Sequence, residues 1–260
     1  MRPEIHVLGL TVQTFGLMFA FAFLACGAIL SRRLEELDRP RDWSYEIVFV
    51  ALLGGLIGAK LYYVAQNYDH TGGLLSNLFS GTGLVWYGGA LGGAVSVLLW
   101  AWRRGLLWVA VMDLGAVPLA VGYGVGRIGC QLSGDGDYGK PWDGPWAMAY
   151  PHGTVPTDVP VHPTPVYETL AMGVLGLLLW RVRDQLRPGA LFALYLVGAG
   201  LERFLVEFIR RNHVAALGLT APQLESLAMT AAGLVWLAVL RRRGGVALAP
   251  LSRPAAARAR

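Results

Sequence analysis

Seven long apolar stretches constrain this chain more than any other feature of its sequence. They cover approximately 11–30, 43–64, 84–102, 107–126, 164–180, 189–210 and 221–240. One helix needs about 20 mostly apolar residues to cross a hydrocarbon core about 30 Å thick. The fifth stretch is short and the sixth contains charged residues, but only 15% of the whole chain is charged, against about 25% in soluble domains. We therefore predict an all-α polytopic membrane protein, a single domain over 1–243 with seven transmembrane helices.

The basic residues are concentrated in alternate loops. The loops after the first, third and fifth stretches and the C-terminal tail contain Arg32, Arg33, Arg39, Arg41, Arg103, Arg104, Arg181, Arg183, Arg187, Arg241, Arg242, Arg243, Arg253, Arg258 and Arg260. The loop over 65–83 has no Lys or Arg. The positive-inside rule then predicts that the N-terminus is outside and the C-terminus cytoplasmic. The net charge of +5 follows this topology and does not indicate nucleic-acid binding.

The remaining segments give four further expectations. The first apolar stretch is too long for a cleavable signal peptide, so we expect a retained span. The loop over about 127–163 should be external and ordered by its aromatic residues, and the Ala/Arg/Pro-rich tail over 244–260 should be a disordered cytoplasmic segment. The two cysteines, Cys26 and Cys130, should be free and packed.

The sixth stretch contains a polar stripe. Arg203, Glu207 and Arg210 fall within about 60° of one another on a helix, so they can pair internally. Ionisable residues at membrane depth are costly and usually face a bundle interior or a wet cavity. We expect Arg203 to be functional, and for Arg210 a functional role and a structural salt bridge are equally supported. Arg211 is expected to be interfacial.

Three more motifs are predicted to reach the same outer half of the bilayer. Gly126, Arg127 and Gly129 form a glycine-rich helix end beside a guanidinium, which suits a phosphate group. Tyr87, Gly88 and Gly89 open the third span. His162 precedes Pro163 and Thr164 at the start of the fifth span, where Thr164 can cap the helix. Their convergence predicts one shared site.

These motifs, in this order, resemble the prolipoprotein diacylglyceryl transferase family, whose members have seven spans. The resemblance runs from Phe15-Gly16-Leu17-Met18 to Arg210. Its specific parts are Gly-Arg-Ile-Gly at 126–129, Tyr-Gly-Lys-Pro at 138–141 with Pro145-Trp146, His-Pro-Thr at 162–164 and Arg-Phe-x-x-Glu-x-x-Arg at 203–210.

The resemblance implies transfer of a diacylglyceryl group from phosphatidylglycerol to the lipobox cysteine thiol of a preprolipoprotein, with release of glycerol phosphate. It implies that Arg127 and Arg203 hold the lipid phosphate and that Glu207 and Arg210 position them. Gly126, Gly129, Gly88 and Gly89 are expected beside the substrate. The expected partners are phosphatidylglycerol, preprolipoprotein signal peptides and the bilayer, in the bacterial cytoplasmic (inner) membrane. No cofactor or metal is expected.

Four positions depart from the family pattern. Tyr87 replaces a histidine proposed as the general base, and a tyrosine of ordinary pKa near 10 is a weak base at neutral pH. Phe15 replaces a tyrosine, and Cys130 stands where an asparagine is common. The segment 134–137 adds a residue before Tyr138.

Two interpretations follow from these departures. Either this is an active transferase in which Tyr87 or His162 accepts the proton, or the scaffold binds lipid without this activity or with another acceptor. Asp135 and Asp137 could serve such an acceptor or a cation, although solvated loop aspartates are the simpler interpretation. A channel or transporter is disfavoured, because the sequence has no inverted repeat and its polar groups favour one side.

Overall fold

A computed structural model describes residues 1–7, 10–66, 85–106 and 108–247, without the side chains of Val7, Leu10, Trp86 and Tyr87. Within these ranges the chain forms seven helices: α1 (Thr14–Glu36), α2 (Trp43–Gln66), α4 (Trp86–Arg103), α5 (Trp108–Ser133), α6 (Thr164–Val182), α7 (Ala190–Glu207) and α8 (Ala221–Arg242). Most of the expected loop over 65–83 and of the tail over 244–260 lies outside the described residues.

The helices confirm a multi-pass membrane protein. By length and composition α1, α2, α5, α6 and α8 are each able to cross a membrane. The fifth apolar stretch, although short, meets this criterion as α6. The two remaining helices, α4 and α7, do not meet it, and α7 contains Glu202, Arg203 and Glu207. The count of seven spans and the orientation of the termini therefore stay predictions.

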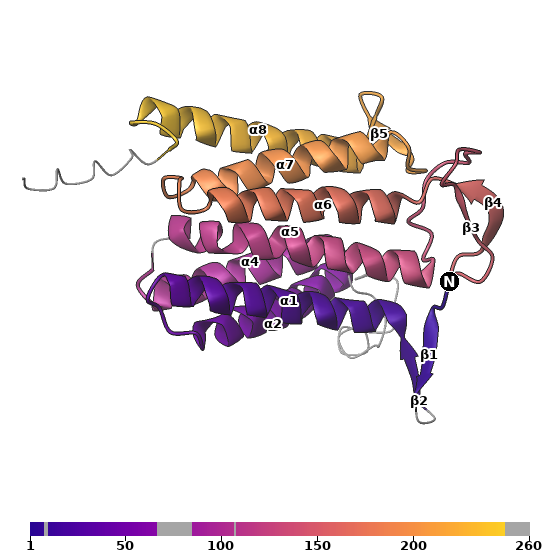
Figure 1. The fold of residues 1–260 in the computed structure, drawn as a ribbon, viewed down its shortest axis with the longest axis horizontal. Coiled ribbons are helices and arrows are strands. Elements are labelled where there is room, and N and C mark those ends of the chain that lie inside the picture. The colour runs from indigo at the N-terminus through magenta and orange to yellow at the C-terminus, as the bar shows by residue number, and fades with distance from the viewer. Residues whose placement is uncertain (8–9, 67–84, 107, 248–260) are drawn as a thin grey trace, which may run out of the picture.

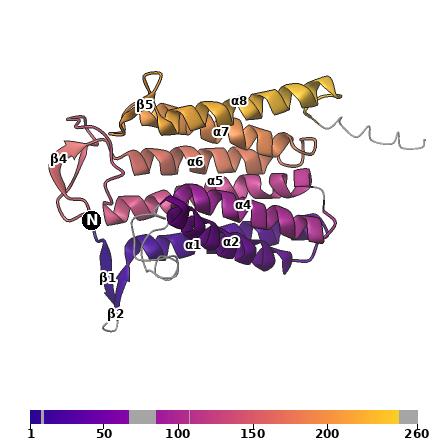
Figure 2. The same ribbon diagram turned by 180° about the vertical axis from the view of Figure 1, so that it is seen from behind.

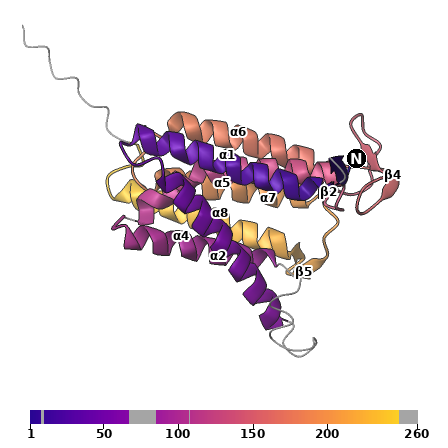
Figure 3. The same ribbon diagram turned by 90° about the horizontal axis from the view of Figure 1, so that it is seen from below.

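The helices lie side by side along their length, with α1, α5, α6, α7 and α8 stacked in succession (Figure 1). The closest pairs are α2 with α4, α7 with α8, α1 with α5, and α5 with α6. Seen from behind, α2 and α4 lie together on one side of the bundle (Figure 2). Seen from below, α2 crosses the other helices obliquely (Figure 3).

Glycines allow the close approach of α2 and α4. A Cβ atom added at Gly58 would lie 2.2 Å from the carbonyl oxygen of Gly88, and one added at Gly54 would lie 1.9 Å from Ser96 Oγ. Small residues let helix backbones approach closely, which is how apolar helices gain packing energy in lipid. Gly88 and Gly92 on α4 face Gly58 and Gly54 on α2 in return.

One end of the bundle, which we call the basic end, is formed by the α1–α2, α4–α5 and α6–α7 connections and the end of α8 (Figure 1). Ion pairs join its segments: Arg183 Nη2 lies 3.0 Å from Glu36, and Arg104 Nη2 lies 2.5 Å from Glu46. Asp113 of α5 accepts hydrogen bonds from the backbone N–H groups of Gly189 and Phe192, at 2.6 and 2.8 Å, and so satisfies free donors at the start of α7.

The opposite end, the hairpin end, carries three two-stranded antiparallel hairpins that an all-α prediction did not include. They pair β1 (Glu4–Val7) with β2 (Leu10–Gln13), β3 (Met148–Tyr150) with β4 (Thr157–Val161), and β5 (Val214–Ala216) with β6 (Leu219–Thr220). A capping box formed by Thr220 and Gln223 then starts α8.

Two boundaries differ from the sequence prediction in ways that matter for the site. Helix α5 continues to Ser133, so Arg127 and Cys130 belong to this helix and not to the loop expected over 127–163. Helix α7 ends at Glu207, so Arg210 lies in the turn that follows it. Both cysteines are free, as expected, and the Cys26 thiol donates to the carbonyl oxygen of Pro118 at 3.1 Å.

Candidate active site

Charged side chains from three helices, one loop and the turn after α7 meet at the hairpin end. We call this set the arginine–carboxylate cluster, and its members are Arg127, Asp137, Glu168, Arg203, Glu207 and Arg210. Arg127 comes from α5, Glu168 from α6, Arg203 and Glu207 from α7. The side chains of Glu168 and Glu207 are fully buried. Buried charges of this kind are stable only when they are paired and hydrogen-bonded.

Arg127 is fully engaged within the protein. Its Nε lies 2.6 Å from Glu168 Oε2, its Nη1 pairs with Asp137, and its Nη2 donates to the hydroxyl of Tyr123 at 3.0 Å. Tyr123 in turn donates its hydroxyl proton to Glu168. Only 15% of the Arg127 side chain is exposed. The guanidinium is therefore held rigidly at the end of α5.

Arg210 is the second arginine paired with several carboxylates. Its Nη2 lies 2.5 Å from Asp137 Oδ1 and its Nη1 lies 3.0 Å from Glu168 Oε1. Its Nε lies 3.7 Å from Glu207 Oε2. Asp137 and Glu168 each bridge Arg127 and Arg210, so the two guanidiniums are fixed relative to each other by two shared carboxylates.

Arg203 differs from these two because one of its N–H donors has no hydrogen-bond partner among the described residues. Its Nη2 lies 3.0 Å from Glu207 Oε2 in an ion pair whose geometry falls short of a hydrogen bond. Its Nη1 is buried and has no hydrogen-bond partner in the described part of the chain. Glu207 is fixed from the other side by Asn212 and Thr220, which donate to Oε1 at 2.7 and 2.8 Å. An unsatisfied guanidinium donor held in place is a ready ligand for an anionic oxygen.

The loop that carries Asp137 is clamped by backbone contacts. The Thr164 hydroxyl donates to the carbonyl oxygen of Asp137 at 2.6 Å, and Gly139 N–H donates to the carbonyl oxygen of His162 at 2.8 Å. Lys140 N–H donates to the carbonyl oxygen of Ile209 at 2.7 Å. These contacts tie the loop to the start of α6 and to the end of α7. A Cβ at Gly139 would lie 2.5 Å from that Ile209 oxygen, so glycine is required for this approach.

The electrostatics of Asp137 follow from this position. Burial alone would raise its pKa, but the guanidiniums of Arg210 and Arg127 outweigh burial and hold the pKa of Asp137 below its ordinary value. Asp137 is therefore an anion at neutral pH. For the neighbouring Asp135, burial dominates and raises the pKa of its carboxyl group.

His162 lies apart from the cluster. Its ring stacks on Trp142 at a centroid distance of 4.4 Å, and its Nδ1 lies 3.4 Å from the Tyr167 hydroxyl. The indole of Trp146 donates to the same hydroxyl at 2.8 Å. Burial lowers the pKa of His162, which favours a neutral imidazole able to accept a proton. No hydrogen bond or ion pair joins its ring to the cluster among the residues that the structure describes.

The four predicted glycines lie in different surroundings. Gly126, next to Arg127, faces open space, because a Cβ atom there would meet no atom within 4 Å. Gly129 packs on α1, where a Cβ would lie 3.1 Å from Met18 Cβ. Gly88 and Gly89 lie in the contact between α4 and α2. Tyr87 stands in the first turn of α4, and its side chain lies outside the described residues.

Three residues complete the cluster beyond those expected from the sequence. Asp137 was interpreted as a solvated loop aspartate, but the structure places it between Arg127 and Arg210. Glu168 and Tyr123 are not among the residues that the sequence motifs single out. One signal in the sequence could have identified Asp137 and Glu168. Buried arginines need carboxylate partners, and the sequence offers few carboxylates in these motifs.

The cluster is a poor candidate for a metal site. Cys130, Asp135 and Asp137 each offer one ligand atom, and these atoms lie within 4.8 Å of one another. Both oxygens of Asp137 are already taken by guanidiniums, and two adjacent arginines oppose a bound cation. The arrangement suits an anion. Its arginines can bind a phosphate group and stabilise the negative charge that develops on that group during a reaction.

Comparisons with known proteins agree with this chemistry. The family model for prolipoprotein diacylglyceryl transferase matches residues 3–239. A phosphatidylglycerol–prolipoprotein diacylglyceryl transferase of Methylobacillus flagellatus is 36% identical over 258 residues, which covers 92% of this chain and 95% of the relative. The protein of that name from Clostridium tetani is 32% identical over 226 residues, with 84% and 90% covered. The one from Vibrio vulnificus strain YJ016 is 33% identical over 251 residues, with 90% and 89% covered.

Proposed function

This chain belongs to the prolipoprotein diacylglyceryl transferase family, and from that premise we propose that it transfers a diacylglyceryl group from phosphatidylglycerol to the lipobox cysteine thiol of a preprolipoprotein, releasing glycerol phosphate. The observation that carries the proposal is the buried, open donor of Arg203 beside a rigid set of paired charges. Relatives named phosphatidylglycerol–prolipoprotein diacylglyceryl transferase match most of the chain.

The reaction requires a sulfur nucleophile, an electrophilic carbon and a stable leaving group. The cysteine sulfur forms a bond to the glyceryl carbon that bears the phosphate, and the bond between this carbon and the phosphate oxygen breaks. The electron pair leaves with glycerol phosphate, and the thiol proton passes to a base. Negative charge therefore grows on the phosphate, and fixed cations in a water-poor site stabilise it most effectively.

We assign direct phosphate binding to Arg203, because Arg127 has all of its nitrogens engaged within the protein. Arg127 then adds fixed positive charge beside the leaving phosphate. Glu207 orients Arg203, and Arg210 holds Asp137 and Glu168 in place. The open face of Gly126 leaves room for the lipid headgroup next to Arg127.

Two residues remain proposed proton acceptors. Tyr87 stands in the family's histidine position. His162 favours the neutral state, but its ring packs with Trp142 and not with the cluster. Replacement of Tyr87 by Phe, with transfer measured, decides between them: loss of activity supports Tyr87, and retained activity places proton removal at His162 or solvent.

The bundle geometry supports seven spans with the site on the external side of the bacterial inner membrane. Helix α4 ends beside Arg104, which pairs with Glu46 at the basic end. Helix α7 follows Gly189, whose N–H donates to Asp113 at that end, and its last residue, Glu207, belongs to the cluster. Helix α7 therefore runs from the basic end to the cluster, and α4 ends at the basic end. The positive-inside rule orients the basic end toward the cytoplasm.

The test uses the purified protein, phosphatidylglycerol and a lipobox peptide, and measures released glycerol phosphate. Release should require the peptide thiol and disappear when serine replaces the peptide cysteine. Arg203→Ala should lower the rate about 100-fold or more, since it removes a donor to developing charge, while Arg203→Lys retains part of it. Arg181→Ala, at the basic end, is the matched control and should keep normal activity.

Two results would contradict the proposal. Lipid binding without thiol-dependent release would indicate a family member that binds lipid and has lost or changed its reaction. Near-normal release by a folded Arg203→Ala protein would remove Arg203 from the phosphate site.

A further inference from the structure

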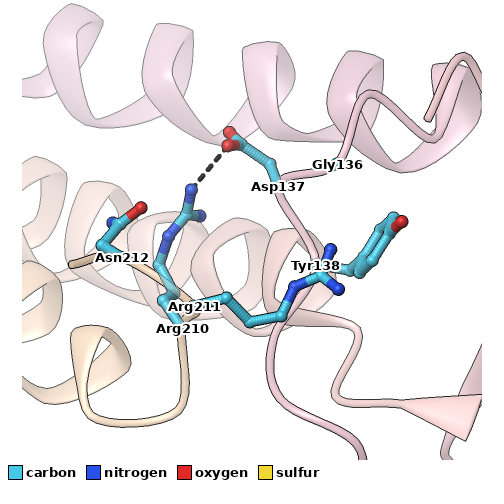
Figure 4. Close-up of a pocket in the computed structure, with 6 residues that line it drawn as sticks. All are labelled: Gly136, Asp137, Tyr138, Arg210, Arg211 and Asn212. Carbon is cyan, nitrogen blue, oxygen red and sulfur yellow. Dashed lines mark hydrogen bonds and ion pairs between the residues drawn. The ribbon is translucent and has the colours of Figure 1, made fainter.

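A polar pocket of about 420 Å³ adjoins the cluster at the hairpin end. Its lining residues are Gly136, Asp137, Tyr138, Arg210, Arg211 and Asn212. Figure 4 shows Arg210 reaching Asp137 on one side of the pocket and Arg211 extending toward Tyr138 on the other. Asp137 and Arg210 belong to both the cluster and the pocket, so the two are continuous.

Arg211 is placed there by an aromatic platform. Its guanidinium carbon lies 4.4 Å from the centre of the Tyr138 ring. Tyr138 is 3% exposed, stacks on Tyr150 at 4.7 Å and donates its hydroxyl proton to the carbonyl oxygen of Val155 at 3.0 Å. Since these contacts hold the ring rigidly, they also restrict the guanidinium that lies over it.

Arg211 brings a cationic charge that the pocket does not neutralise. Arg210 donates hydrogen bonds to Asp137 and Glu168 and forms a longer ion pair with Glu207, and the Asn212 amide donates to Glu207. Arg211 has no ion pair or hydrogen bond among the described residues, and its ring contact leaves its N–H donors available. With Arg210 and Arg211 against Asp137, the lining carries one excess positive charge.

We propose that this pocket binds a phosphate monoester, namely the glycerol phosphate released by the reaction, with Arg211 as its main anion ligand. The inference rests on the proposed transferase function and goes beyond it by giving the product a site of its own. The pocket leads from the cluster toward the exposed side chain of Arg211, so the product would pass through it to the external solution.

The charge change in the reaction supports this assignment. The phosphate of phosphatidylglycerol is a diester with one negative charge. Once its bond to the glyceryl carbon breaks, the phosphate becomes a monoester with a second ionisation near pH 6, so it carries close to two charges at neutral pH. An additional unpaired arginine therefore favours the product over the lipid, and it draws the product away from Arg203.

The same chemistry could come from the lipid headgroup, and the experiment separates the two sources. Glycerol phosphate, or inorganic phosphate as a second probe, is titrated into the purified full-length protein without acceptor peptide, and heat or ³¹P NMR is followed. Arg211→Gln should weaken binding of both probes about tenfold, because one charge-assisted contact is lost. Arg211→Lys should fall between, and Arg181→Gln should bind as the unchanged protein does.

A second arm measures the enzyme at work. Glycerol phosphate should inhibit transfer less strongly in Arg211→Gln than in the unchanged protein, while the KM for phosphatidylglycerol in vesicles stays within about twofold. Binding of the free monoester should also tighten as the pH rises from 5 to 7, following its second ionisation near pH 6.

The outcomes distinguish this inference from the proposed function. If Arg211→Gln binds the monoester as tightly as the unchanged protein, the pocket is not a product site. If the KM for phosphatidylglycerol rises and monoester binding is unchanged, Arg211 serves the lipid headgroup and the inference is wrong. If monoester binding depends on Arg211 but no thiol-dependent transfer occurs, the anion site stands and the transferase proposal fails.

Discussion

At the scale of single residues, the arginines at the hairpin end divide into two kinds. Arg127 and Arg210 are both paired with Asp137 and Glu168. Arg203 and Arg211 keep donors without partners in the described structure. The paired arginines fix the geometry and the open ones are free to meet an anion. A count of arginines in the sequence does not reveal this division, because it depends on which carboxylates the fold delivers.

Glu168 is the residue on which the paired set depends most. Its carboxylate is fully buried and contacts Arg127, Arg210 and Tyr123. Glu168→Gln would leave two buried guanidiniums with one shared acid, and such a loss costs about 3–5 kcal/mol. We expect a clearly lower midpoint of thermal unfolding in detergent. Glu225→Gln, at an exposed position of α8, is the control, and equal midpoints for both variants would contradict this role.

Asp137 makes a prediction about pH. Because its pKa in the folded protein is lowered by Arg210 and Arg127, its stabilising effect is complete above the unfolded value of about 3.9 and is lost as the pH falls through the folded pKa. The difference in unfolding midpoint between the unchanged protein and Asp137→Asn should therefore be largest at neutral pH and shrink in acid.

Asp135→Asn gives the contrasting case. Burial raises the pKa of Asp135, so its ionisation destabilises the fold as the pH rises. Its substitution should be neutral in acid and neutral to stabilising at pH 7. The same pH dependence in both variants would show that Asp137 is not held by the two arginines.

At the scale of elements, the apolar stretches predicted most helix ends to within about three residues, as α2 shows by starting at Trp43 in both the prediction and the structure. Helices α1 and α5 continue further than predicted, to Glu36 and Ser133. In lipid the backbone N–H and C=O groups must be hydrogen-bonded within the protein. A long apolar run therefore forms a helix, which satisfies these groups internally. The end of α5 was predicted too early, because its last residues contain polar groups that leave the apolar pattern. They remain helical through contacts such as Arg127 with Glu168.

The candidate site was predicted only in part for a similar reason. The spacing of Arg203 and Glu207 on one helix face was enough to predict their ion pair, which the structure confirms. Asp137 joins Arg127 within its own region of the chain but joins Arg210 across 73 positions, through a loop with no periodic pattern. Sequence patterns report local geometry, whereas this contact depends on how the loop docks against α6 and α7.

The glycine contact between α2 and α4 can be tested at this scale. In Gly58→Ala the new Cβ would lie 2.2 Å from the Gly88 carbonyl oxygen and 2.8 Å from Gly92 Cα, and neither backbone atom can move alone. The two helices must separate, which should lower stability by about 1–3 kcal/mol. The measurement is unfolding in detergent by circular dichroism.

Gly173→Ala on α6 is the matched control, since its added Cβ would meet nothing within 4 Å. It should be neutral or stabilising by up to about 1 kcal/mol, from the higher helix propensity of alanine. Equal losses in both variants would show that the effect comes from glycine flexibility and not from the contact between the helices.

At the scale of the whole molecule, the two ends of the bundle have different chemistry. The basic end is joined by ion pairs such as Arg183 with Glu36, and its loops hold most of the arginines that follow the positive-inside rule. The hairpin end holds the cluster and the pocket. If the basic end is cytoplasmic, the cluster opens on the side where a secreted preprolipoprotein presents its thiol, and the released glycerol phosphate leaves on that side.

This orientation can be tested by labelling single introduced cysteines with a membrane-impermeant maleimide in spheroplasts. Leu217, at the turn between β5 and β6, is 92% exposed, so Leu217→Cys should react in intact spheroplasts. Arg181→Cys, at the exposed end of α6, should react only after the membrane is permeabilised. Cys26 and Cys130 are packed and should give little background, which the unchanged protein measures directly. The reverse pattern would invert the topology and move the cluster to the cytoplasmic side, and labelling of both positions in intact spheroplasts would contradict a bundle whose ends lie on opposite sides of the membrane.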